Sequence, residues 1–100
     1  MESGNTLITF IINHGDAYDV MAVAREAGAK GGTILNAHGT RREEDISFFG
    51  MHLASEKDML LIMAEKDAAR KILDAVKKLP LFKKAGGGVI YTNDVTRITS

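Results

Sequence analysis

Three consecutive glycines, Gly86, Gly87 and Gly88, follow two lysines and precede a β-branched stretch near the end of the chain. Successive glycines can adopt positive φ angles and turn several backbone N–H groups toward one concavity, an arrangement that binds phosphate. Lys83 and Lys84 would add positive charge beside it. The structural alternative is a turn that leads from a helix into a strand. The glycine triplet alone leaves both interpretations open.

The other polar residues indicate little chemistry. His14, His38 and His52 lack the spacing of metal ligands and no cysteine is present, so no metal site is predicted. The serines and histidines form no nucleophile and base pattern, and we therefore expect no catalysis. Residues 41–45 read RREED and form either a solvated loop or a loop that contacts a partner protein. The predicted contact residues are Arg42, Glu43, Glu44 and Asp45.

Length and composition limit the class of protein. The chain of 100 residues is predicted to form a single domain over residues 1–100. Thirteen basic residues balance thirteen acidic ones, so bulk charge favours neither nucleic acid nor an anionic membrane. No apolar run approaches the roughly 18 residues that span a bilayer, and the N-terminus lacks a basic signal region. We expect a cytoplasmic protein that does not insert into a membrane.

Apolar periodicity predicts the secondary structure. Strands are expected at residues 7–13, 33–37, 49–54, 59–65 and 89–98, the last interrupted near Asn93 and Asp94. The third and fourth are predicted to form a hairpin through the charged turn at residues 55–58. Helices are expected from an Asp16 cap to Gly28 and from an Asp67 cap to Pro80. The apolar stripe of the second helix comprises Ala69, Ile72, Leu73, Val76 and Leu79.

The predicted element order is β-α-β-β-α-β, which is typical of the α+β ferredoxin-like fold. An antiparallel sheet would then carry two helices on one face, while its other face needs a different cover. Candidates for that second face are Phe10, Ile12, Met59 and Met63. Oligomerisation would bury it, and a trimer is the expected assembly.

Two segments carry a family resemblance over nearly the whole chain. GAKGGTILNAHGT, at residues 28–40, resembles the second strand of the PII nitrogen-regulatory signalling proteins. AGGGVIYTNDVTRI, at residues 85–98, is similar to their glycine-rich B-loop and the following strand. The resemblance implies a compact trimer that binds adenine nucleotides in clefts between subunits. It further implies regulation of a partner, either a membrane transporter or a metabolic enzyme.

The resemblance also implies roles for individual residues. Thr33 would lie near the adenine, Met63 would line the base pocket, and Gly39 would begin the T-loop. Arg41 or Arg42 would reach the terminal phosphate, because a guanidinium can donate two hydrogen bonds at once. The implied phosphate loop comprises Lys84, Gly86, Gly87 and Gly88. Without the resemblance, Thr33 is an ordinary strand residue and Met63 an ordinary core residue.

Departures from the family pattern limit the expected ligand. Val89 stands where relatives carry a lysine, and apolar Leu61 stands where they carry an acid in the third strand. The T-loop segment is short and has no tyrosine, and the chain stops at Ser100 where relatives continue with an arginine-rich tail. These differences favour ADP or AMP over ATP and leave a role for Mg²⁺ open. They give no basis for uridylylation or for control of glutamine synthetase.

Two other classes of function remain as alternatives. One is a metal-tolerance trimer similar to the CutA-like proteins, which share this architecture and for which the histidines are the only support. The other is a small ferredoxin-like enzyme or lyase, which would need a cleft with a titrating histidine or carboxylate.

Overall fold

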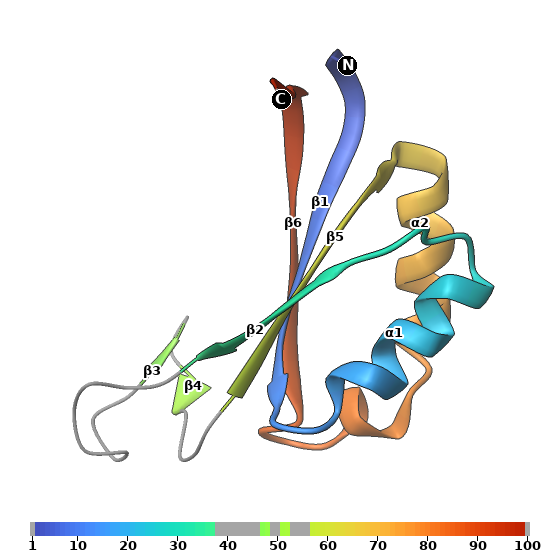
Figure 1. The fold of residues 1–100 in the computed structure, drawn as a ribbon. Coiled ribbons are helices and arrows are strands. Elements are labelled where there is room, and N and C mark those ends of the chain that lie inside the picture. The colour runs from blue at the N-terminus through green and yellow to red at the C-terminus, as the bar shows by residue number, and fades with distance from the viewer. Residues whose placement is uncertain (1, 38–46, 49–50, 53–56, 100) are drawn as a thin grey trace.

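The protein is described from a computed structural model, which covers residues 2–37, 47–48, 51–52 and 57–99. Along the chain, its elements are β1 (Glu2–Asn13), α1 (Ala17–Glu26), β2 (Thr33–Ala37), β3 (Ser47–Phe48), β4 (Met51–His52), β5 (Lys57–Glu65), α2 (Lys66–Val76), the 3₁₀ helix η2 (Pro80–Lys83) and β6 (Gly88–Arg97). Both helices lie on one side of the main sheet (Figure 1).

The main sheet has four strands in the order β2-β5-β1-β6, and every neighbouring pair is antiparallel. The long apolar strand β1 lies in the interior of the sheet, where it pairs with β5 on one side and β6 on the other. This strand order and the two helices on one face confirm the predicted ferredoxin-like α+β fold. The edges of the sheet are β2 and β6.

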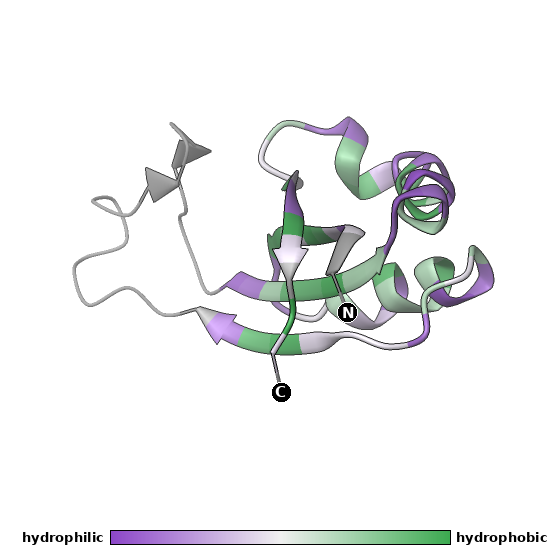
Figure 2. Cartoon of the chain, turned by 90° about the horizontal axis from the view of Figure 1, so that it is seen from above, coloured by the Kyte–Doolittle hydropathy of each residue, from purple (hydrophilic) through white to green (hydrophobic). Residues whose placement is uncertain are grey.

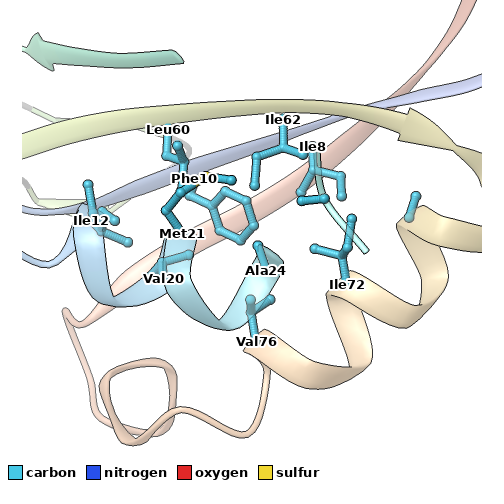
Figure 3. Close-up of a cluster of buried hydrophobic side chains, with 13 residues drawn as sticks. Ile8, Phe10, Ile12, Val20, Met21, Ala24, Leu60, Ile62, Ile72 and Val76 are labelled. Carbon is cyan, nitrogen blue, oxygen red and sulfur yellow. The ribbon is translucent and has the colours of Figure 1, made fainter. Parts of the chain in front are cut away.

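The core lies between the sheet and the helices. Ile8, Phe10 and Ile12 of β1 are fully buried there, because residues two apart in a strand share a face. They pack with Leu60 and Ile62 of β5 and with helix residues (Figure 3). The helix residues of this core cluster are Ala17, Val20, Met21, Ala24, Ala69, Ile72 and Val76.

This core corrects one expectation about the sheet. Phe10 and Ile12 were expected to cover the face away from the helices, and that prediction is wrong because both share the helix-covered face with Ile8. The Phe10 ring lies 6.2 Å from the Phe82 ring of η2, measured between centroids. Met59 and Met63 do lie on the opposite face, since they pair with Ile11 and Leu7.

The face away from the helices is also apolar, and we call it the open face. Leu7, Thr9 and Ile11 form its central row, with Met63, Leu61 and Met59 opposite them on β5. On β6 the same row meets Asn93, Tyr91 and Val89. Strand β5 is coloured hydrophobic over most of its length, whereas the helices carry bands of both colours (Figure 2). Both faces of the sheet thus carry apolar side chains, although only one face is covered by helices.

Helix α1 ends as predicted. Gly28 has a φ of 120°, its N–H donates to the Arg25 carbonyl at 3.1 Å, and the Ala29 N–H donates to the Ala24 carbonyl at 2.9 Å. This pair of bonds is the Schellman motif, in which a glycine in the left-handed region satisfies the last carbonyls of a helix. Asp16 is the residue that caps the start, although its side chain makes no capping hydrogen bond.

Helix α2 differs from its predicted limits. It begins at Lys66 with Glu65 as the N-cap, so Asp67 lies in the first turn instead of capping the helix. The helix ends at Val76, and Pro80 begins the separate 3₁₀ helix η2 instead of terminating α2. Proline suits this position because the first turn of a helix does not use its missing N–H.

The predicted hairpin and the predicted strand interruption are both wrong. Within the described residues, β4 pairs with β3 in a separate two-stranded sheet and not with β5. Lys57 and Asp58, expected in a turn, are the first residues of β5 and are buried. Strand β6 continues through Asn93 and Asp94, which pair with Leu7 and Thr6 of β1.

Candidate functional site

The glycine triplet forms a tight turn between η2 and β6. The Gly87 N–H donates to the Lys84 carbonyl at 3.1 Å. Gly86, which directly precedes Gly87, has a φ of 76°. A positive φ at this position is characteristic of a type II turn and favours glycine. Lys83 and Lys84 are exposed beside the turn. The turn therefore has its own structural need for glycine.

The other two glycines allow close packing. A Cβ on Gly87 would lie 1.7 Å from the Leu81 carbonyl oxygen, which is far inside van der Waals contact. A Cβ on Gly88 would lie 2.9 Å from both Ile12 Cγ2 and Phe82 Cε1. These contacts explain the triplet as a junction that seats η2 against the sheet. Phosphate binding by the triplet stays a prediction, and the Gly87 N–H already has a partner within the turn.

The two residues implied to contact the base do come together. Thr33 and Met63 line one pocket of about 370 Å³ with Leu7, Gly31, Gly32 and Leu61. We call it the base pocket, after the role that the resemblance implies for Thr33 and Met63. A Cβ on Gly32 would lie 3.0 Å from Met21 Sδ and 3.1 Å from both Leu60 Cδ1 and the Leu61 oxygen, so glycine lets the chain approach β5 closely. Leu61, at the position where the resemblance implies an acid, gives this pocket an apolar wall.

Within one chain the glycine turn and the base pocket are far apart. The pocket includes Thr33 on the edge strand β2, whereas Gly88 begins the opposite edge strand β6. The pocket residue nearest to β6 is Leu7 of β1, and it pairs with Asn93, which lies five residues or about 17 Å along β6 from Gly88. A single chain therefore does not bring these two groups of predicted site residues together.

The remaining predicted residues lie outside the described part of the chain. They are Gly39, Arg41, Arg42, Glu43, Glu44 and Asp45. The chain leaves the sheet at Ala37 and returns at Lys57, and these two residues are register partners in the β2–β5 pair. Residues 38–56 therefore depart from and return to the same end of the sheet.

A buried carboxylate at that end was missed by the sequence analysis. Asp58 is 4% exposed, and its two oxygens lie 3.0 Å from His14 Nδ1 and 3.0 Å from the Gly15 nitrogen, which donates to it. Next to it the Lys57 ammonium donates to the Asn13 side-chain oxygen. These contacts tie the start of β5 to the turn between β1 and α1. The alternation of Asp58 with Leu60 and Ile62 could have revealed its buried face.

The described residues give no support to a metal centre. No group of three or more histidine, cysteine, aspartate or glutamate side chains in this part of the chain could hold a metal ion. His38 and the side chain of His52 lie outside the described part of the structure. No helix within the described ranges is long and apolar enough to cross a membrane.

Comparison with known structures identifies the fold. The chain is similar to a PII-like signalling protein from Thermus thermophilus, with a TM-score of 0.70 and 19% identity over 98% of this chain and 94% of that one. CPII from Thiomonas intermedia K12, bound to ADP, AMP and acetate, matches with a TM-score of 0.70 and 17% identity over 99% and 94%. A structure of CPII bound to ADP and bicarbonate matches with a TM-score of 0.63 and 19% identity over 93% and 87%.

Comparison of sequences defines the family. No match is found among curated proteins. The model of the family described as "Nitrogen regulatory protein P-II" matches residues 5–100, which is nearly the whole chain. The predicted resemblance is thus confirmed, and this chain belongs to the nitrogen regulatory protein P-II family.

Proposed function

We propose that the protein is a nucleotide-responsive signalling module of the cytoplasm. It binds ADP or AMP in clefts between the subunits of a homotrimer and regulates a membrane transporter or a metabolic enzyme. Its role is to report nucleotide state and not to catalyse a reaction. The observation that carries this proposal is the separation, within one chain, of the pocket at Thr33 and Met63 from the glycine turn at the start of β6.

Two copies of the chain can complete what one copy cannot. The β2 edge of one copy supplies the base pocket with Thr33, and the β6 edge of the next supplies the glycine turn with Lys84. A cyclic assembly pairs unlike edges in this way and closes on itself, so each interface holds one equivalent cleft. The family resemblance and the ADP and AMP named for CPII support a nucleotide as the occupant.

The open face supports an oligomer. Leu35 is 46% exposed and Met63 is 45% exposed on this face, whereas Thr9 and Ile11 of its central row are buried at 2% and 4% exposure. An exposed apolar face of this kind marks a protein interface, because its burial removes apolar surface from water. A trimer places three such faces around one axis, with the three clefts at its interfaces.

The residues that line the base pocket favour a nucleotide with few phosphate contacts. Leu7, Leu61 and Met63 offer apolar surface to a purine ring, as is usual for ligand pockets. Val89 and Leu61 replace two charged residues of the family pattern, so fewer groups remain to hold a triphosphate and its Mg²⁺. Lys84 and one of Arg41 and Arg42 are the proposed phosphate contacts, together with the glycine turn.

Regulation requires that the ligand prefers one state of the partner-binding segment. We assign partner contact to Arg42, Glu43, Glu44 and Asp45, which lie between the two register partners Ala37 and Lys57. Nucleotide in the cleft would change the affinity of that segment for its partner. Hydrogen exchange should then show protection of residues 38–56 on addition of ADP, and unchanged exchange there would count against this coupling.

Mixing two variants tests the shared cleft. Thr33→Arg fills the base pocket from the β2 edge, and Lys84→Glu reverses the charge at the β6 edge. Each variant alone should assemble but bind ADP poorly. Trimers refolded from an equal mixture should regain about a quarter of the wild-type sites, because a cleft is intact only when each edge comes from the chain that is unaltered there.

The control is Lys71→Glu on the exposed face of α2, which should bind ADP as the wild type does. Calorimetric titration gives the number of sites in each preparation. Absence of recovery in the mixture would place the whole site within one chain and refute the shared cleft. The metal-tolerance alternative has no supporting observation among the described residues.

A further inference from the structure

A second pocket of about 240 Å³ adjoins the base pocket, and its lining includes Asn5, Lys30, Met63, Glu65 and Ile98. We call it the distal chamber. Of the described residues that line the two pockets, Met63 alone belongs to both. The two spaces therefore meet at the side chain of Met63.

The strand register places the two pockets next to each other along β1 and β5, and the distal chamber also reaches Gly28, Ala64 and Ala68 on the helix side of the sheet. On β1, Leu7 lines the base pocket, and Asn5, two residues away on the same face, lines the distal chamber. On β5, Met63 pairs with Leu7 and Glu65 pairs with Asn5. The connection between α1 and β2 follows the same direction, with Thr33 at the base pocket and Lys30 at the distal chamber.

The two pockets differ in the polarity of the side chains that line them. The base pocket presents the apolar side chains of Leu7, Leu61 and Met63. The distal chamber adds the amide of Asn5, which is 5% exposed, the ammonium of Lys30 and the carboxylate of Glu65. A group that enters the distal chamber would thus meet both hydrogen-bond donors and acceptors. At about 240 Å³ the chamber lies below the roughly 300 Å³ at which pockets for whole ligands begin, so it suits an added group.

Resting on the proposed function, we propose that the distal chamber is a subsite for a polar substituent on the nucleotide base, and that Met63 determines specificity for it. Methionine has an unbranched, adaptable side chain, so a change in the conformation of Met63 can open or close the connection between the base pocket and the distal chamber. The predicted ligand class is a purine nucleotide whose base carries a short polar chain. Such a nucleotide would place its ring in the base pocket and its substituent past Met63.

Calorimetric titration of the full chain with ADP and three ADP analogues tests this subsite. One analogue carries a hydroxyethyl group on the exocyclic amino nitrogen of adenine. The other two carry a hydroxyethylamino group on C2 or on C8, the ring carbons that bear hydrogen in ADP. At least one analogue should bind wild-type protein within about tenfold of ADP, since the substituent occupies existing space. Exclusion of all three analogues from a protein that binds ADP would overturn the subsite and leave the proposed function standing.

Variants of Met63 test its role in specificity for the substituted nucleotide. Met63→Ala should improve the affinity of that analogue relative to ADP by about tenfold, and Met63→Phe should worsen it by a similar factor. Met59→Ala is the matched control, because Met59 lies on the same face of β5 but lines neither pocket. It should leave the ratio unchanged. An unchanged ratio in both Met63 variants would overturn the specificity role.

The polar end of the chamber has its own test. Lys30→Ala and Glu65→Gln alter exposed side chains, so both variants should fold and bind ADP as the wild type does. At least one of them should weaken the analogue several-fold. Equal affinities for the analogue in wild type and both variants would overturn the polar contacts of the subsite. If wild-type protein binds neither ADP nor any analogue, the proposed function and this inference both fail.

Discussion

Replacing Gly87 by alanine should destabilise the protein strongly, and the reason is steric. The new Cβ would lie 1.7 Å from the Leu81 carbonyl oxygen, where ordinary contacts begin near 3.4 Å. The obstacle is backbone, so no side-chain rotation relieves it. The matched variant is Gly86→Ala, at a position where a Cβ meets nothing within 4 Å but φ is 76°. The pair separates a steric clash from the cost of a left-handed backbone.

The expected magnitudes differ between these neighbouring positions. Overpacking costs typically about 1–3 kcal/mol, and the Gly87 to Lys84 hydrogen bond is worth about 1 kcal/mol if the turn must open. We therefore expect Gly87→Ala to lower the free energy of unfolding by about 3 kcal/mol. Gly86→Ala meets a left-handed penalty of about 1–2 kcal/mol, partly offset by lower entropy of the unfolded chain. Its net cost should be about 1 kcal/mol.

Thermal and urea unfolding measure both variants at one protein concentration, because oligomers gain stability with concentration. For a domain of this size, about 1 kcal/mol lowers Tm by roughly 4–8 °C, so Gly87→Ala should melt more than about 10 °C below wild type. Gly86→Ala should melt a few degrees below it. If Gly87→Ala were as stable as Gly86→Ala, the packing of η2 against the turn would be refuted.

Further predictions concern the buried carboxylate, the open face and the phosphate contacts. Asp58→Ala removes the partner of the Gly15 N–H and of His14, so it should lower the free energy of unfolding in urea by about 3 kcal/mol. The control Asp74→Ala, at an exposed side chain, should lower it by under about 0.5 kcal/mol. Equal losses would contradict a stabilising role for the Asp58 contacts. Leu35→Arg should keep the far-UV circular dichroism of the wild type but lower the mass in sedimentation equilibrium, and an unchanged mass would remove Leu35 from the interface. Arg41→Ala or Arg42→Ala should weaken ADP by about tenfold in calorimetry, and wild-type affinity in both would refute arginine at the phosphate.

Local patterns predicted the elements well where the signal lies within a few residues. Strand β2 was expected at residues 33–37 and occupies Thr33–Ala37, and Gly28 ends the first helix through a motif that glycine favours. Strand β1 was harder, because a nearly continuous apolar run does not show which face is covered. The side chain of Phe10 was therefore assigned to the wrong face of the correct strand.

Contacts between distant residues caused the larger errors. Lys57 and Asp58 have the composition of a turn, and the partners that bury them, Asn13, His14 and Gly15, lie more than 40 residues earlier in the chain. No local rule reports such partners. The hairpin was placed wrongly for the same reason, since β5 pairs with β1 and β2 instead of with its neighbour in sequence.

The candidate site, too, could be predicted from the sequence only in part. Thr33 and Met63, which the resemblance implied at the base, line one pocket, and their contact with a base stays a prediction. The family assignment followed from the same motifs. The distal chamber could not be predicted, because its lining ranges from Asn5 to Ile98 and depends on the register of β1 against β5. The structural need for Gly87 was equally hidden, because it depends on how η2 folds back on the turn.

Calorimetric titration of wild-type protein with ADP shows whether this family member responds to nucleotide. We expect saturable binding with one ADP per chain, because each interface of a closed ring holds one cleft. Wild-type protein that is folded and assembled but releases no heat with ADP, and shows no shift of Tm in its presence, would contradict the claim that this family member responds to nucleotide.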